Sequence, residues 1–201
     1  MKKFVEFPKM ARLSRDIIIT EKIDGTNASI DIINNLIDED NYGDPSIIVT
    51  IDGRNIRAGS RTRWVTPKDD NHGWAKWVLE HAEELIGLGE GTHFGEWWGS
   101  GIQRGYGLPK GEKRFSLFNV ARWRDGGKDV RPACCHVVPV LWEGMFDTQA
   151  INHTLELLKN AGSMASPGFK DPEGIIVWHT AANFGFKKTI KNDESPKSSV
   201  K

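Results

Sequence analysis

The sequence predicts an α+β fold of largely antiparallel sheets flanked by a few helices. Runs of β-branched or aromatic residues, each bounded by Gly, Asn, Asp or Pro, recur along the chain and are typical of strands. Two stretches carry apolar residues at the 3.6-residue spacing of an amphipathic helix. Because the strand signals dominate and the helices are few, the α+β class is favoured.

The predicted elements follow from these signals in chain order. The predicted strands cover residues 17–20, 28–33, 47–51, 115–121, 137–142, 174–179 and 184–190. One helix is predicted over residues 73–85, with Asp70 or Asn71 as its N-cap. A second helix is predicted over residues 147–160, where an Asp-Thr pair begins it and Gly162 ends it.

The chain length and the apolar runs bound the protein class. With 201 residues and no low-complexity linker, we expect one domain over residues 1–192 and a polar tail over residues 193–201. The apolar runs are far shorter than the ~20 residues that a membrane span needs. The N-terminal residues also lack the apolar region of a signal peptide. We therefore expect a soluble, cytoplasmic protein without a membrane partner, and a monomer by default.

Charge and cysteine content exclude several functions. The 27 Lys and Arg residues equal the 27 Asp and Glu residues, so no overall positive field predicts nucleic-acid binding. Residues 54–68 and 104–131 are nevertheless locally basic, and an acidic cluster at residues 38–44 is expected to be a solvated turn. Cys134 and Cys135 are adjacent, which excludes a disulfide framework or a zinc site, and we expect buried or partly buried thiols.

The stretch TEKIDGTNASI, residues 20–30, places charges at the end of an apolar strand. An isolated lysine there would usually extend to solvent. Lysine becomes a nucleophile only as a neutral amine, which requires partial desolvation or nearby positive charge. In a strand-like register Asp24 projects on the same side as Lys22, and Asn27 adds a hydrogen-bonding amide. Gly25 is expected to let backbone approach a ligand closely.

Four further stretches carry candidate residues: HFGEWWG with Glu96, FSLFNVARW with Phe118, PEGIIVWH with Glu173, and FGFKKTIK with several lysines. Each has an ordinary structural explanation. Glu96 could be an exposed residue in an aromatic-rich turn, and Phe118 could pack in the core. Lysines on an edge strand commonly protect against aggregation. The order of the stretches along the chain, rather than any one of them, points to a shared function.

KIDGTN, residues 22–27, resembles motif I (KxDG) of the covalent nucleotidyltransferases, the superfamily of ATP-dependent ligases and mRNA capping enzymes. The four later stretches resemble its motifs III, IIIa, IV and V in the family order. The resemblance implies a nucleotidyltransferase (ATP-grasp-like ligase) domain over residues 1–192. KIDGTN and GEWWG look most like the RNA-ligase-2-type branch of bacteriophages and their relatives. An OB-fold needs on the order of 70 residues, more than follow motif V, so none is expected.

The resemblance implies how a nucleotide is bound. Lys22 would accept AMP covalently from ATP. The backbone near Glu21 and Ile23 would contact the adenine together with the ring of Phe118. Glu96 would position the ribose. Asn119 stands where the family often has aspartate, so Phe118 is the stronger candidate of that pair.

Motifs IV and V supply the candidate phosphate and metal contacts. The resemblance implies that Glu173 binds Mg²⁺, the metal expected where hard oxygens and phosphates are the ligands. If Phe186 faces the core, Lys187 and Lys191 share the other face of the strand, whereas Lys188 points with Phe186. Lys187 is therefore favoured as the phosphate contact, and Lys188 and Lys191 remain open.

The basic segment after motif I resembles motif Ia, which carries an arginine in ligases. Arg61 would then contact the phosphates or ribose of ATP, and Arg63, on the same side of a strand, competes for this role. Arg54 and Arg57 are expected on a solvated or RNA-facing surface.

The resemblance implies an ATP-dependent RNA ligase of RNA repair. After Lys22 takes AMP, the AMP passes to an RNA 5′-phosphate, and a 3′-OH then displaces it. Lys187 and Mg²⁺ would neutralise charge on the phosphates, and Asp24 and Asn27 would act mainly in the later steps. RNA is the expected partner, with DNA possible and a separate protein clamp possible. The alternatives are a stand-alone adenylyltransferase, a minimal DNA-nick ligase, and a non-catalytic nucleotide- or RNA-binding module, which would have no need of Lys22.

Overall fold

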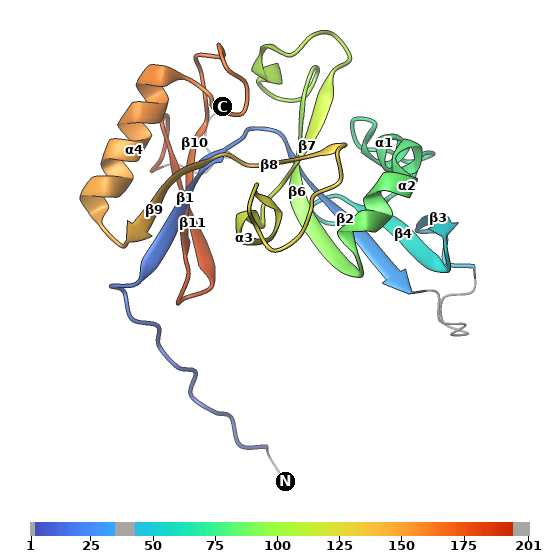
Figure 1. Ribbon diagram of the computed structural model, residues 1–201, viewed down its shortest axis with the longest axis horizontal. Helices are drawn as coiled ribbons and strands as arrows, with labels where there is room; N and C mark the ends of the chain where they lie inside the picture. The colour runs from blue at the N-terminus through green and yellow to red at the C-terminus, as the bar shows by residue number, and fades with distance from the viewer. Residues whose placement is uncertain (1–2, 35–42, 195–201) are drawn as a thin grey trace. The chain divides into compact units, whose positions relative to one another are not determined.

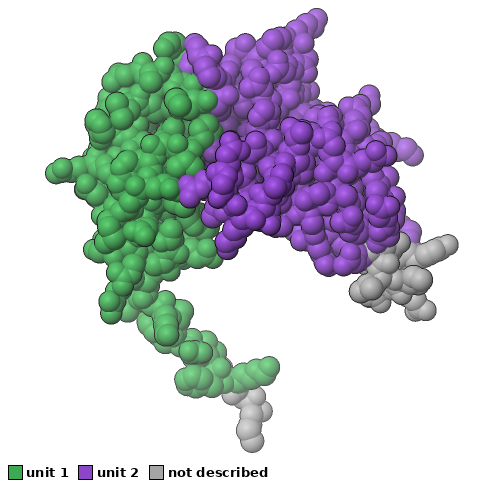
Figure 2. Space-filling view, in the orientation of Figure 1, with its two compact units in different colours: residues 1–22, 139–164, 170–201 green, residues 23–138, 165–169 purple. Residues whose placement is uncertain are grey.

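The computed structural model describes residues 3–34 and 43–194. These residues form two compact units, which Figure 2 distinguishes by colour. Unit 1 comprises residues 1–22, 139–164 and 170–201, and unit 2 comprises residues 23–138 and 165–169. The chain therefore enters unit 2 directly after residue 22, returns to unit 1 at residue 139, and enters unit 2 once more for residues 165–169. Each unit is described by itself below.

Unit 1 is a four-stranded antiparallel sheet with one helix (Figure 1). Its strand order is β11-β10-β1-β9. The strands are β1 (Asp16–Lys22), β9 (Val140–Met145), β10 (Gly174–His179) and β11 (Phe184–Thr189), and the helix is α4 (Thr148–Ala161). Ile17, Ile19, Ile175 and Val177 share one face of the sheet and are buried against Leu155 and Leu158 of α4. The other face of the same strands carries Lys22.

Helix α4 begins and ends as its sequence predicts. Asp147 is the N-cap, and its carboxylate accepts a hydrogen bond of 2.9 Å from the Gln149 N–H. Gly162 follows the last turn with φ 92°, a conformation that favours glycine. The helix thus lies within one residue of the predicted bounds of 147–160.

Unit 2 is built on a seven-stranded sheet. Its order is β3-β4-β2-β6-β7-β8, with β5 paired to β4, and all pairs are antiparallel except β7 with β8. The strands are β2 (Thr26–Asn34), β3 (Ile47–Ile51), β4 (Arg54–Gly59), β5 (Trp64–Val65), β6 (Gly91–Gly99), β7 (Lys113–Leu117) and β8 (Cys135–Val137). The described residues of unit 2 also form the short α-helices α1 (Trp74–Glu80), α2 (Ala82–Leu85) and α3 (Val120–Trp123) and the 3₁₀ helices η2 (Ile86–Leu88) and η3 (Gly105–Gly107).

The core of unit 2 lies on one face of this sheet and is rich in aromatic rings. Trp74 of α1 is fully buried, and its ring centroid lies 4.6 Å from Phe115 and 5.3 Å from Trp97. The N-cap residue of α1 is Gly73. The Asp70 carboxylate, three residues earlier, accepts hydrogen bonds from the first-turn N–H groups of Ala75 and Lys76 at 2.8 and 3.1 Å. The prediction that Asp70 or Asn71 is the N-cap is therefore wrong in position, and the predicted single helix over residues 73–85 is broken at His81.

The opposite face of the unit 2 sheet presents polar and aromatic side chains. Ala28 and Ile30 of β2 belong to the core, so the alternating residues Asn27 and Ser29 point to the other face. Asn27 is the Cα partner of Glu96 in β6, and Ser29 is the partner of Phe94, which is 61 % exposed. This surface, which we call the open face, carries candidate nucleotide-binding residues of motifs I and III.

The fold class is confirmed, and so are most strand positions. The predicted strand 174–179 coincides with β10. The predicted strand 115–121 is wrong in its second half, because β7 ends at Leu117 and helix α3 begins at Val120. The predicted strand 137–142 is two strands, since β8 ends at Val137 and Pro139, which has no N–H, precedes β9.

Strands β4, β5 and β6 carry signals too weak to be predicted from the sequence. β6 contains Gly91, Gly95 and Gly99, and glycine has a low intrinsic propensity for β-strands. Gly95 is required by packing, since a Cβ there would lie 2.5 Å from the Ser116 carbonyl oxygen. The close approach of β7, which only the folded sheet reveals, explains this glycine.

Several other expectations meet the structure here. Cys135 is buried and Cys134 partly buried, which confirms the free-thiol prediction. Hydrogen bonding to Cys134 and burial raise the pKa of the Cys135 thiol. Of the acidic cluster, residues 38–40 lie outside the described residues. Asp193, at the start of the predicted tail, accepts a 2.7 Å hydrogen bond from the Thr189 N–H, whereas residues 195–201 are not described. No helix in the described part of the chain has the length and apolar character to cross a membrane.

Candidate functional site

Motif I spans the point where the chain passes from one unit to the other. Lys22 is the last residue of β1 in unit 1, and Ile23, which is 3 % exposed, is the first residue of unit 2. The strand-like register in which Asp24 was expected to project on the side of Lys22 is not formed, because β1 ends at Lys22. The motif I residues are described unit by unit.

In unit 1, Lys22 pairs with Glu173. The Lys22 Nζ donates a hydrogen bond of 2.5 Å to the Glu173 Oε2, across 151 residues of sequence. The Lys22 side chain is 21 % exposed, whereas that of Glu173 is 2 % exposed. The Cα partner of Lys22 in β10 is Gly174, which follows Glu173 directly. The antiparallel pairing of β1 with β10 thus brings the motif I lysine and the motif IV carboxylate together.

Gly174 lets β11 approach β10 closely. A Cβ at this position would lie 2.2 Å from the Lys188 carbonyl oxygen and 2.7 Å from the Thr189 Cα. Since neither atom belongs to a flexible side chain, only glycine fits without a shift of β11. The close approach of β11, which carries motif V, therefore requires glycine at the position after Glu173.

The sheet register places Lys187 on the same face as Lys22. Lys187 of β11 pairs with Ile176 of β10, which in turn pairs with Thr20 of β1. Thr20 lies two residues before Lys22, and alternate residues of a strand share a face. Among the described residues no carboxylate is within ion-pair distance of Lys187. Its position agrees with the register argument that favoured Lys187.

The other two lysines of motif V have carboxylate partners. Lys188 pairs with Ile175 across the strands and so belongs to the face covered by α4, and its Nζ lies 3.7 Å from an Asp193 oxygen. Lys191 follows β11, and its Nζ is 2.7 Å from the Asp171 carboxylate. Both ion pairs are solvent-exposed and therefore contribute little to stability.

Glu21 supports the loop that follows α4. Its side chain is 1 % exposed, and its two oxygens accept hydrogen bonds from the Ser163 hydroxyl at 2.6 Å and the Met164 N–H at 2.8 Å. The predicted adenine contact near Glu21 concerned its backbone. This structural role of the side chain was not predicted.

In unit 2, Glu96 is held by the turn of motif I. Its Oε1 accepts a 3.0 Å hydrogen bond from the Gly25 N–H, and its Oε2 accepts a 3.2 Å bond from the Asn27 side-chain amide. Glu96 is 8 % exposed and lies in β6, so the explanation as an exposed glutamate in a turn is wrong.

Gly25 has a packing role that the sequence argument did not consider. A Cβ on Gly25 would lie 2.4 Å from the Trp97 carbonyl oxygen and 2.8 Å from the Trp98 Cβ. Because the backbone of β6 approaches Gly25 this closely, packing within the protein alone requires glycine at this position, whether or not a ligand binds.

Asp24 is held by a loop that no sequence motif indicated. The Arg104 Nε donates a 3.0 Å hydrogen bond to the Asp24 Oδ2, and the Asp24 N–H donates a 2.9 Å bond to the Tyr106 hydroxyl. Asp24 is 7 % exposed. Two polar residues of one segment thus fix both the side chain and the backbone of the motif I aspartate.

Phe118 follows β7 and remains 42 % exposed, which leaves ring surface for stacking. The explanation that Phe118 packs in the core is therefore wrong. Its N–H donates a 2.9 Å hydrogen bond to the Phe94 carbonyl oxygen. The neighbouring Asn119 caps α3, since its side chain accepts a 3.1 Å hydrogen bond from the Arg122 N–H.

The arginines of the basic segment differ in their partners. Arg63 forms hydrogen bonds of 2.6 and 3.1 Å with the Asp69 carboxylate, whereas Arg61 is exposed and has no ion-pair partner in the described residues. Arg57 pairs at 2.6 Å with Asp31, which is 6 % exposed, and lies over Trp64. The prediction of a solvated or RNA-facing Arg57 is therefore wrong.

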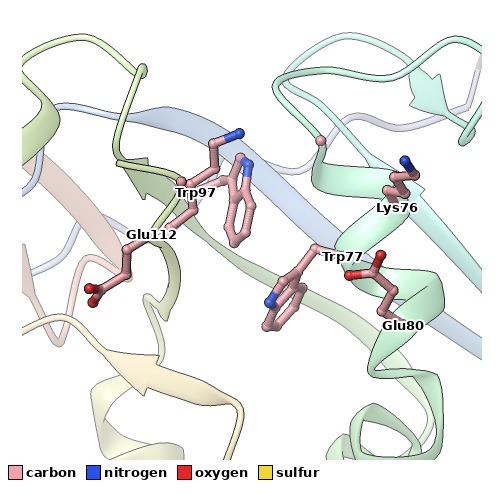
Figure 3. Close-up of a pocket in the computed structure, with 8 residues that line it drawn as sticks. Lys76, Trp77, Glu80, Trp97 and Glu112 are labelled. Atoms are coloured by element: carbon pink, nitrogen blue, oxygen red, sulfur yellow. The ribbon is translucent and has the colours of Figure 1, made fainter. Parts of the chain in front are cut away.

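A pocket of about 340 Å³ lies beside the aromatic core of unit 2 (Figure 3). Lys76, Trp77 and Glu80 of α1 lie on one side of it, and Trp97 and Glu112 lie on the other. None of the predicted site residues lines this pocket. In the described residues no group of three or more His, Cys, Asp or Glu side chains is arranged to hold a metal ion.

The geometry supports two kinds of chemistry. Unit 1 presents an amine beside a buried carboxylate, with a second lysine on the same sheet face, a set suited to an anionic phosphate and a cation. Unit 2 presents a hydrogen-bonded carboxylate with an exposed aromatic ring on the open face, a set suited to a sugar and a base.

Comparisons with known proteins identify related chains. The family model described as RNA ligase matches residues 15–192. A Naegleria gruberi RNA ligase mutant with ATP and Mn is similar in fold, with a TM-score of 0.56, 16% identity, and coverage of 88% of this chain and 50% of that chain. Another mutant of that ligase, with AMP and Mn, gives a TM-score of 0.56, 18% identity and coverage of 87% and 49%.

The chain thus spans about half the length of the solved structures that it matches. At these identities the likeness concerns the fold alone. Among curated proteins no sequence matches significantly.

Proposed function

Because the chain belongs to the RNA ligase family, we propose that it is the adenylating part of an ATP-dependent RNA ligase. In the proposed reaction the Lys22 Nζ attacks the α-phosphorus of ATP. The new N–P bond forms as the P–O bond to pyrophosphate breaks, and the product is a lysyl-AMP phosphoramidate. The AMP then passes to an RNA 5′-phosphate, and a 3′-OH displaces it to form the phosphodiester.

The pairing of Lys22 with Glu173 is the observation that carries this proposal. Desolvation of a partly buried lysine and a buried carboxylate offsets much of their attraction, so the pair is not readily explained by a contribution to stability. The pair joins the two residues that the family motifs assign to nucleotide attack and metal binding. A protein that only binds nucleotides would not need a nucleophile here.

Glu173 has two roles in the proposal. Attack requires the neutral amine, so a proton must leave Lys22, and the Glu173 Oε2 lies within hydrogen-bond distance of it. The carboxylate is also a hard-oxygen ligand of the kind that Mg²⁺ takes together with substrate phosphates. A Mg²⁺ ion held by Glu173 and ATP would neutralise phosphate charge.

Lys187 is assigned to the phosphates of ATP. It shares the sheet face of Lys22 and has no carboxylate partner in the described residues, so its charge is available to an anion. Lys188 and Lys191 are paired with carboxylates and are less suited to this role.

The residues of unit 2 are assigned to the rest of the nucleotide and to the polynucleotide. Glu96 would accept a hydrogen bond from a ribose hydroxyl, and Phe118 would stack on the adenine. Arg61, the less constrained of the two competing arginines, is assigned to the phosphates or ribose. Asp24 and Asn27 are assigned to the later steps.

Covalent labelling tests the proposal directly. The protein is incubated with ATP labelled at the α-phosphate and Mg²⁺, then denatured and separated by electrophoresis. We expect label on the wild type and none on Lys22→Arg, which keeps a cation to pair with Glu173 but cannot take AMP in the same way. Lys159→Ala is the matched control, because this exposed lysine pairs with Glu156 on the same helix, α4, and is not one of the predicted site residues. An unlabelled wild type, or a labelled Lys22→Arg, contradicts the proposed mechanism.

The choice of polynucleotide is tested separately. We expect the labelled protein to join nicked duplexes with RNA on the 3′-OH side faster than all-DNA duplexes. Equal rates would favour a minimal DNA-nick ligase. Labelling without any joining would favour a stand-alone adenylyltransferase.

A further inference from the structure

Residues 99–107 of unit 2 have an unusual backbone. Left-handed φ values occur at Gly99, Gly101, Gly105 and Gly107, and also at two residues with side chains, Gln103 at 45° and Tyr106 at 52°. A bulky side chain in this region is uncommon, because its Cβ crowds the backbone. Such strain persists only where the surroundings hold the residue in place, and it is often associated with a functional position.

Tyr106 is held from several sides. It is fully buried, its ring stacks on Phe169 at 4.6 Å, and it meets Trp98 edge-on at 5.3 Å. Its carbonyl oxygen accepts a 2.8 Å hydrogen bond from the Ser166 hydroxyl. These contacts fix the phenol so that its hydroxyl accepts the 2.9 Å hydrogen bond from the Asp24 N–H.

Arg104 precedes Tyr106 by two residues and completes the arrangement. Its side chain is 25 % exposed and that of Asp24 is 10 % exposed, so the pair is partly shielded from water. The 3.0 Å bond from the Arg104 Nε fixes the orientation of the carboxylate. A shielded charge-assisted hydrogen bond constrains geometry more than an exposed one.

We infer that Arg104 and Tyr106 are positioning residues for Asp24, and that they act on the steps that follow lysine adenylation. This inference rests on the proposed function, in which Asp24 serves the transfer of AMP and the joining step. Arg104 orients the carboxylate, and Tyr106 fixes the backbone that carries it. The strained loop is explained by the need to present both groups to one residue.

A double-mutant cycle tests the inference. Two rates are measured for each variant: labelling of Lys22 by ATP, and transfer of AMP from the isolated labelled protein to a 5′-phosphorylated nicked duplex. We expect Arg104→Gln to label within about threefold of wild type and to slow transfer by on the order of 10²-fold, because a small misplacement of a reacting group is costly. Arg104→Lys should recover part of the transfer rate. In an Asp24→Asn background, Arg104→Gln should slow transfer no further.

Two further variants distinguish a positioning role of Arg104 and Tyr106 from a general loss of stability. Tyr106→Phe keeps the ring that stacks on Phe169 and removes the hydroxyl that accepts the hydrogen bond from the Asp24 N–H, and it should slow transfer more than labelling. Arg122→Gln is the matched control, since Arg122 is a partly buried arginine of the same unit that pairs with Asp129. It should leave both rates unchanged.

The outcomes that contradict the positioning role differ from those that contradict the proposed function. A wild type that takes no label contradicts the proposed function. A labelled wild type with additive effects of Arg104→Gln and Asp24→Asn contradicts the positioning role, as does an Arg104→Gln variant that transfers AMP at the wild-type rate. Equal slowing by Arg122→Gln would also contradict it, because the effect would then reflect general destabilisation.

Discussion

Replacing Gly174 by alanine should disturb the candidate site without altering a reacting residue. The new Cβ would lie 2.2 Å from the Lys188 carbonyl oxygen, so β11 would have to move by about 1 Å to restore an ordinary contact. Overpacking and weakened strand hydrogen bonds together would lower the free energy of unfolding by about 2–4 kcal/mol. Because total stabilities are roughly 5–15 kcal/mol, the variant should still fold. The displaced strand carries Lys187, so lysine labelling should slow as well.

The assay for Gly174→Ala combines urea unfolding, followed by tryptophan fluorescence, with the labelling rate. Gly185→Ala is the matched control on the same pair of strands, because the atoms nearest to its Cβ would belong to side chains, Trp178 at 3.2 Å and Ile176 at 3.5 Å, and the Trp178 side chain can shift. We expect Gly185→Ala to cost less than half as much stability as Gly174→Ala. Equal stability of the two variants would refute the argument that β11 backbone excludes a side chain at position 174.

Two further predictions address the lysines of motif V and a buried histidine. Lys187→Ala should slow labelling by on the order of 10²-fold, as expected for a lost phosphate contact, whereas Lys188→Ala should change it by less than about threefold; the reverse order would exchange their assigned roles. Burial lowers the pKa of His93 below its usual 6.5. The unfolded chain therefore binds a proton at His93 more readily than the folded chain does. As a result, the free energy of unfolding should fall as the pH drops below about 6.5. His93→Gln should flatten this pH dependence in urea unfolding, and an unchanged slope would contradict the role of His93.

Local sequence patterns predicted the elements whose signals are complete within a short window. The helix over residues 147–160 has its cap, apolar face and terminating glycine in sequence, and the structure places it within one residue. The strand over 174–179 is a continuous β-branched run bounded by a glycine, and it is confirmed. Hydrophobic periodicity and helix caps depend on neighbouring residues alone, so they can be predicted from a short window of the sequence.

Elements that depend on distant partners were missed or misassigned. Gly95 and Gly99 of β6 are required because β7 and the residues just before it approach them closely, and this proximity has no local signal. Arg57 appeared to be a surface cation, but its partner Asp31 lies on the adjacent strand β2. Arg104 and Tyr106 were not identified either, because the aspartate that they contact is about 80 residues away in sequence.

The sequence by itself determined the order and identity of the motif residues, and with them the membership that the family model confirms over residues 15–192. It also determined which residue types are present for the proposed phosphate chemistry: the lysine, the carboxylates and the aromatic residue of motif IIIa. Only the tertiary structure decided that Glu173 pairs with Lys22, that Lys187 rather than Lys188 shares its sheet face, and that a strained loop holds Asp24. Residue identity is a local property of the chain, whereas strand pairing and register are set by contacts between segments that are far apart in sequence.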